Sequence, residues 1–153
     1  MRLQRACGAD ENQAGVALVE FALVLPVLLL ILVAMLDFGR AFNYWIDETQ
    51  LASAGARWAI VNKNPSGSGT LQAYIKSQAD TRELKDGANV SICFPNGTSN
   101  VGDPVRVTVS YDFNWLGFWA KATTLVLPPK LSGSSTMRLE AVPSNFSSDG
   151  VCT

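Results

Sequence analysis

The chain of 153 residues has room for one domain, and its 12 Lys and Arg nearly balance its 13 Asp and Glu. This balance argues against a nucleic-acid-binding protein, which usually presents a basic surface. The sequence contains no histidine, so it excludes Ser-His-Asp and Cys-His nucleophile arrangements and every His-ligated metal site. Charged residues make up only 16% of the chain, so its apolar residues must be concentrated somewhere.

They are concentrated from Val16 to Leu36, a run whose only charged residue is Glu20. At about 1.5 Å per residue, a helix of this length crosses the roughly 30 Å of a bilayer's hydrocarbon core. A cleaved secretory signal is the alternative, but its apolar region is usually only about 7 to 15 residues long. This run is longer and ends at Asp37, so we expect a retained membrane span.

The distribution of charge and cysteine predicts the orientation of the span. Two arginines precede the span, Arg2 and Arg5, and Arg40 follows it closely, so the charge difference favours a cytoplasmic N-terminus only slightly. Cys7 lies before the span, whereas Cys93 and Cys152 lie after it, as expected of a disulfide in a small extracytoplasmic domain. Two free thiols, or a bond to another subunit, are the alternatives to a disulfide between Cys93 and Cys152.

Beyond the span, the helical pattern continues without a turn signal to about Val61. Residues at spacings of three and four form one stripe that needs a partner surface. We expect this stripe to pack against the rest of the domain. It consists of Phe38, Phe42, Trp45, Thr49, Ala52, Ala56 and Ala59.

The remainder of the chain predicts a short helix followed by a small sheet. A loop rich in Ser and Gly leads to Thr70, an expected N-cap for one helix from Leu71 to about Leu84, which Lys85-Asp86-Gly87 would end. The pattern then alternates with a period of two in residues 89–94, 105–113 and 131–140. We therefore predict three half-buried strands, the first two antiparallel, and an α+β fold. An aromatic cluster before the last strand is expected in the core or in a contact surface, and it contains Trp115, Leu116, Phe118 and Trp119.

Glu20 is the most informative residue of the span, because an ionisable side chain in hydrocarbon costs several kcal/mol unless it is paired or protonated. Cleavage after Gly15 would give Val16 a new α-amino group, and Glu20 lies one helical turn further along. That amine could neutralise Glu20 within its own subunit or from a neighbour. The alternative is a carboxylate that snorkels to the lipid headgroups.

Two stretches resemble a known class of proteins. The polar leader ending at Gly15, followed by Val16-Ala17-Leu18-Val19-Glu20-Phe21, resembles the prepilin-peptidase site of type IV pilin-like proteins. The continuation to Pro26, together with Asp37-Phe38-Gly39-Arg40 and Ala54-Gly55-Ala56-Arg57, resembles the TadE-like minor pilins, or pseudopilins, of the tight-adherence (Tad or Flp) pilus system. The strand regions 101–111 and 135–140 are similar to the sheet of that family.

The resemblance implies a pilin-like fold: a long N-terminal transmembrane helix continues into an amphipathic stem packed on a small antiparallel sheet. It implies a leader at 1–15, a span at 16–36 and an extracytoplasmic domain at 37–153, in which 37–62 form the stem, 63–87 a loop and short helix, and 88–153 the sheet and tail. Gly15 and Val16 would flank the cut, and Glu20 with Phe21 would serve assembly.

The same resemblance implies a role in pilus assembly, without catalysis, metal or cofactor. The expected partners are prepilin peptidase, other Tad pilins and pseudopilins, the inner-membrane assembly platform and membrane lipid. The protein is expected in the bacterial inner membrane, in the pilus or at its tip. A single-pass anchored binding module that never enters a filament is the alternative.

Overall fold

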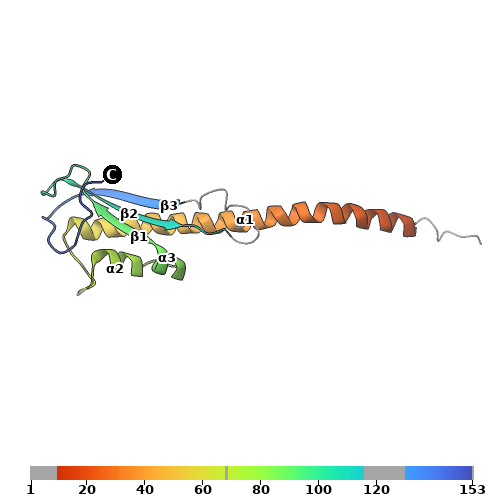
Figure 1. The fold of residues 1–153 in the computed structure, drawn as a ribbon, viewed down its shortest axis with the longest axis horizontal. Helices are drawn as coiled ribbons and strands as arrows, with labels where there is room; N and C mark the ends of the chain where they lie inside the picture. Colours follow the sequence, from red (N-terminus) through yellow and green to blue (C-terminus); the bar gives the residue numbers. More distant parts are fainter. Residues whose placement is uncertain (1–9, 68, 116–129, 153) are drawn as a thin grey trace, which may run out of the picture. The chain divides into compact units, whose positions relative to one another are not determined.

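The computed structural model describes residues 10–67, 69–115 and 130–152. Their order is α1 (Asp10–Ile60), α2 (Leu71–Ser77), α3 (Arg82–Gly87), β1 (Asn89–Cys93), β2 (Pro104–Asp112) and β3 (Lys130–Arg138) (Figure 1). This confirms the predicted α+β fold, a long apolar helix with a three-stranded antiparallel sheet. The contacts divide the chain into two units, Met1–Phe38 and Gly39–Thr153, and each is described by itself.

The first unit contains the N-terminal part of α1. The predicted long helix is confirmed, although it begins at Asp10 instead of Val16. Pro26 lies inside it. The most apolar 18-residue window has a mean hydropathy of 3.0, and none of it is buried, so α1 is long and apolar enough to cross a membrane.

The second unit contains the sheet, whose strands follow the order β1-β2-β3 with both pairs antiparallel. In the register, Val107 lies opposite Ile92 on one side and Ser135 on the other. Val105, Val107 and Val109 are all fully buried, as the alternation in the sequence predicted. One face of the sheet therefore belongs to the core.

The C-terminal part of α1, from residue 39 onward, covers that face, as Figure 1 shows for the stretch beside β1, β2 and β3. Ala52, Ala56 and Ala59 are completely buried. On β3, a Cβ added to Gly133 would lie 2.5 Å from backbone atoms of Glu48 and Thr49, so only glycine permits this approach. Small residues on both elements thus set the spacing between helix and sheet.

The predicted stripe on this helix is confirmed at its three alanines and wrong at its three aromatic residues and at Thr49, which is also exposed. Phe42 and Trp45 are 55% and 47% exposed, and Phe38 is 71% exposed. Tyr44 is buried in their place, with its ring edge-on to Tyr111 at 5.7 Å and Phe113 at 5.6 Å. These ring contacts favour a helix rotation that buries Tyr44 and leaves the other aromatic residues outside.

The single helix predicted from Leu71 to Leu84 is also wrong, because the chain forms two helices there. Thr70 caps α2 as predicted, accepting a hydrogen bond from the Ala73 amide, and Thr81 caps α3. At the break, the Asp80 amide donates to Asp47 Oδ2 at 2.9 Å. This contact satisfies an amide that the break leaves without a helical partner. Lys85, Asp86 and Gly87 belong to the last turn of α3.

Candidate functional site

The expected processing junction lies within α1. Gly15, Val16, Glu20 and Phe21 are all helical and exposed, and no atom lies within 4 Å of a Cβ added to Gly15. Four positions apart on a helix, Val16 and Glu20 share a face. An α-amine created at Val16 would therefore lie one turn from the Glu20 carboxylate.

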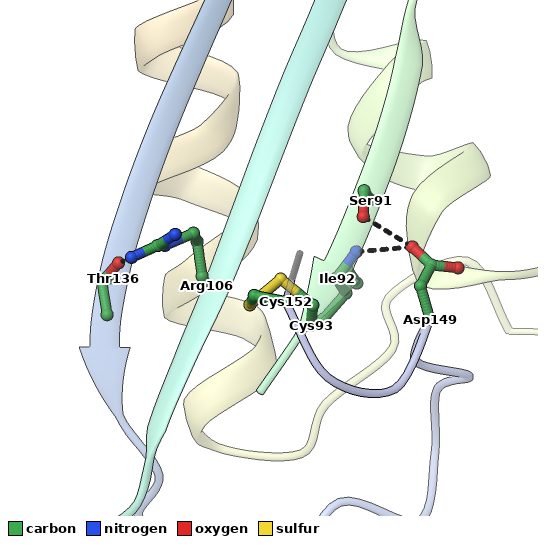
Figure 2. Close-up of a disulfide and its surroundings, with 7 residues drawn as sticks. All are labelled: Ser91, Ile92, Cys93, Arg106, Thr136, Asp149 and Cys152. Carbon is green, nitrogen blue, oxygen red and sulfur yellow. Dashed lines mark hydrogen bonds between the residues drawn. A yellow bond between two sulfur atoms is a disulfide. The ribbon is translucent and has the colours of Figure 1, made fainter. Parts of the chain in front are cut away.

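A second feature lies at the outer edge of β1, where the C-terminal tail binds. Cys93 at the end of β1 forms a disulfide with Cys152, with the two Cα atoms 5.0 Å apart (Figure 2). Next to the disulfide, Phe94 and Val151 form a parallel bridge, and the Phe94 amide donates to the Gly150 carbonyl at 2.9 Å. The tail therefore covers part of an edge that would otherwise be open.

Asp149 strengthens this attachment, as Figure 2 shows. Its Oδ2 accepts hydrogen bonds from the Ser91 hydroxyl at 2.7 Å and from the Ile92 amide at 3.1 Å. Its own amide donates to the Ile92 carbonyl at 2.7 Å. Sequence reasoning did not assign this role to Asp149, because no local motif links residue 149 to a strand some 57 residues earlier.

The other end of the tail is fixed to the end of α1. Asn62 adopts a left-handed conformation with φ of 51°, and its Oδ1 accepts from the amides of Ser144 and Asn145, each at 2.9 Å. The carbonyl of Ile60 accepts from the amides of Glu140 and Ala141. Sequence reasoning missed these hydrogen bonds between the tail and the end of α1. The available signal was an asparagine just after a helix, which indicates a C-cap in the left-handed conformation.

Two acidic residues of α1, Asp47 and Glu48, are buried within the second unit. Glu48 is 0% exposed, and neither carboxylate oxygen has a hydrogen-bond partner among the described residues. Burial is the main cause that raises its pKa, to about 7, and the charge of Asp47 adds to this. The Tyr111 amide lies near the carboxylate without hydrogen-bond geometry and offsets part of the rise. Burial also raises the pKa of Asp47. Sequence reasoning missed both residues, since acids are usually expected on the solvated face of such a helix.

The predicted aromatic contact surface is only partly described. Trp115 is partly buried and lies edge-on to Phe113, with ring centroids 5.2 Å apart. Leu116, Phe118 and Trp119 lie outside the described residues. The structure therefore places Trp115 against the core.

The site residues form no metal centre in the part of the chain that the structure describes, where no group of three or more Cys, Asp or Glu could hold an ion. Residues 15–57 match the family of TadE-like proteins, which confirms the resemblance over that segment; the match does not extend to the strand regions 101–111 and 135–140. No curated protein and no solved structure matches the chain. The matched segment includes the Gly15 junction, the apolar helix and most of the stem.

Proposed function

We propose, because the chain is TadE-like over residues 15–57, that it is a minor pilin, or pseudopilin, of the Tad pilus system. In this role it is processed by prepilin peptidase and is needed for assembly of Flp-type adhesive pili. The observation that carries the proposal is that one family match covers both the junction at Gly15 and the stem that packs on the sheet.

The residues at the junction take distinct roles in this proposal. The peptidase cuts between Gly15 and Val16 on the cytoplasmic side, where no atom of the described residues lies within 4 Å of a Cβ added to Gly15. The freed amine then pairs with Glu20, beside Phe21, in its own subunit or in a neighbouring pilin. Such pairing removes the cost of an isolated carboxylate in lipid and so links processing to assembly.

The rest of the chain presents a structural domain to the assembly machinery. Residues 1–15 form the leader, 16–36 the span of the bacterial inner membrane, and 37–153 the extracytoplasmic domain. Its proposed partners are other Tad pilins and pseudopilins and the inner-membrane platform. The protein acts by contact with these partners and needs no catalytic residue or cofactor.

The test is the N-terminus of the protein isolated from membranes that contain the cognate peptidase. Mass spectrometry is expected to find Val16 first in the wild type and Met1 retained in Gly15→Leu. Gly39→Leu is the matched control, since Gly39 is also helical with open space around its Cβ position, and it should be processed normally. Retention of Met1 in the wild type would refute processing and favour an anchored binding module that does not enter a filament.

A further inference from the structure

Exposed apolar residues continue along α1 well beyond the span proposed above, with Asn43 the one exposed polar residue between Glu20 and Thr49. Phe42, Trp45 and Ile46 are 55%, 47% and 38% exposed, and the rings of Phe42 and Trp45 lie 5.8 Å apart. At helical spacings of three and four, these three residues share one face. We call them the aromatic face.

Charge is absent from the exposed surface over the same stretch. Between Glu20 and Arg57, both exposed, the sequence contains four charged residues, and none of them is exposed: Asp37, Arg40, Asp47 and Glu48. Asp37 is only 1% exposed. The Arg40 guanidinium lies over the rings of Tyr44 and Phe113, at 5.9 Å and 5.6 Å from their centroids. If lipid covers the exposed surface of this stretch, it therefore contacts no exposed charged side chain.

The polarity of the exposed face changes after Ile46. The next exposed residues of α1 are Thr49, Gln50, Ala54 and Arg57. The face thus passes from apolar to polar along the helix axis, as expected where a helix leaves a membrane.

The length of the apolar stretch fits a hydrocarbon layer that begins just after Glu20, a few residues later than the start of the 16–36 span, so that Val16 and Glu20 lie in the inner headgroup layer. A hydrocarbon layer of roughly 30 Å takes about 20 helical residues, and an outer headgroup layer of about 5 to 8 Å takes three to five more. Counted from Phe21, the hydrocarbon layer ends near Arg40 and the headgroup layer between Asn43 and Trp45. The aromatic face then coincides with the headgroup layer, where Trp and other aromatic residues are enriched.

We propose that the aromatic face binds phospholipid at the outer surface of the membrane, so that the stem begins within the headgroup layer. The proposal rests on the membrane anchor described under the proposed function. A second copy of the chain is the competing occupant. The three side chains expose only roughly 300 Å² together, well below the about 800 Å² per partner of a stable protein interface.

Nitroxide labels on the full chain test this in nanodiscs of phosphatidylethanolamine and phosphatidylglycerol. In a Cys7→Ser background that keeps the Cys93–Cys152 disulfide, single cysteines replace Phe42 or Ile46, and power saturation compares their accessibility to oxygen and to a water-soluble nickel complex. Leu28→Cys reports on the anchor, while Gln50→Cys and Ala54→Cys are matched controls on exposed, more distant positions of the same helix.

The expected result is that the ratio of oxygen to nickel accessibility is highest at position 28, intermediate at 42 and 46, and lowest at 50 and 54. A ratio at 42 and 46 as low as that at 50 and 54, with position 28 still in lipid, would overturn the inference and leave the anchor intact. Nickel accessibility at 28 would refute the anchor itself. A second copy of the chain would shield the labels at 42 and 46 from both reagents and would cause spin–spin broadening in discs that hold two copies. This result would assign the aromatic face to a protein contact and also overturn the inference.

Discussion

The buried Glu48 predicts that the protein becomes less stable as the pH rises through neutrality. Its carboxyl group is fully buried, and its oxygens have no hydrogen-bond partner among the described residues, so the core favours the neutral, protonated form. In the unfolded chain the same group ionises near its ordinary pKa of 4.5. The folded protein therefore holds a proton that the unfolded protein releases.

The sign and size of the effect follow from this difference in pKa. The stabilising contribution is fully present below about pH 4.5 and is lost as the pH rises through the folded-state pKa of about 7. One pKa unit corresponds to about 1.4 kcal/mol, so the whole rise is worth about 3 kcal/mol. The pKa of Asp47 is raised as well, so its titration acts in the same direction. Lys85 attracts the Asp47 carboxylate, whereas Asp80 repels it.

The assay is urea denaturation of the full chain in detergent micelles, followed by near-ultraviolet circular dichroism, with the disulfide intact. Between pH 5 and pH 8.5, the wild type should lose about 2 to 3 kcal/mol of unfolding free energy. Glu48→Gln should lose much less, because the amide does not titrate. Glu140→Gln, at an exposed position, should retain the wild-type slope. A flat wild-type profile, or an unchanged slope in Glu48→Gln, would refute the assignment to Glu48.

Three further predictions concern packing, assembly and the tail. Gly133→Ala should lower the unfolding free energy by about 1 to 3 kcal/mol, because its Cβ would meet the backbone of Glu48. The exposed Ser134→Ala should change the same quantity by no more than about 0.5 kcal/mol, and equal effects would contradict the close approach. Glu20→Gln should leave cleavage at Gly15 intact but reduce recovery of partner pilins in crosslinking; unchanged recovery would indicate that Glu20 only snorkels. Peptide mapping without reduction should find Cys93 linked to Cys152 in protein from the native envelope, whereas complete alkylation of both thiols would exclude the bond. Cys152→Ser should lower the free energy of unfolding by roughly 4 kcal/mol, the chain-entropy estimate for a disulfide with a sequence separation of 59.

The elements that depend on local pattern were predictable from the sequence. Alternation placed all three strands within two residues of their observed ends, because one face of each strand is buried and the other is not. Thr70 marked the start of α2 because a threonine side chain can accept the hydrogen bond of an otherwise unpaired amide. The apolar run likewise identified the first part of α1, whose length alone suits a membrane.

The elements that depend on contacts distant in sequence were not predictable. The break between α2 and α3 coincides with Asp47, 33 residues before the amide that it accepts. The tail is attached by Asn62 and Asp149, whose partners are 82 and 57 residues away. The position of Asn62 after a helix indicated a C-cap but not its partners, and Asp149 had no local signature, since a polar side chain has the same hydrogen-bonding capacity on the surface as in a tertiary contact.

The orientation of the stem was predicted wrongly in its first half for a related reason. Helical periodicity identifies a face by its apolar residues, but a helix that follows a membrane span has two apolar surroundings, the protein core and the lipid. Phe42 and Trp45 suit either, and the sequence alone gives no ground for choosing between them. The structure buries Glu48 and leaves these aromatic residues exposed, which would be unfavourable for a stem surrounded by water. The exposure of the aromatic residues is favourable where the outer face of the stem meets lipid. Glu48 lies beyond that layer, and its burial follows instead from the close approach of its backbone to Gly133 of the sheet.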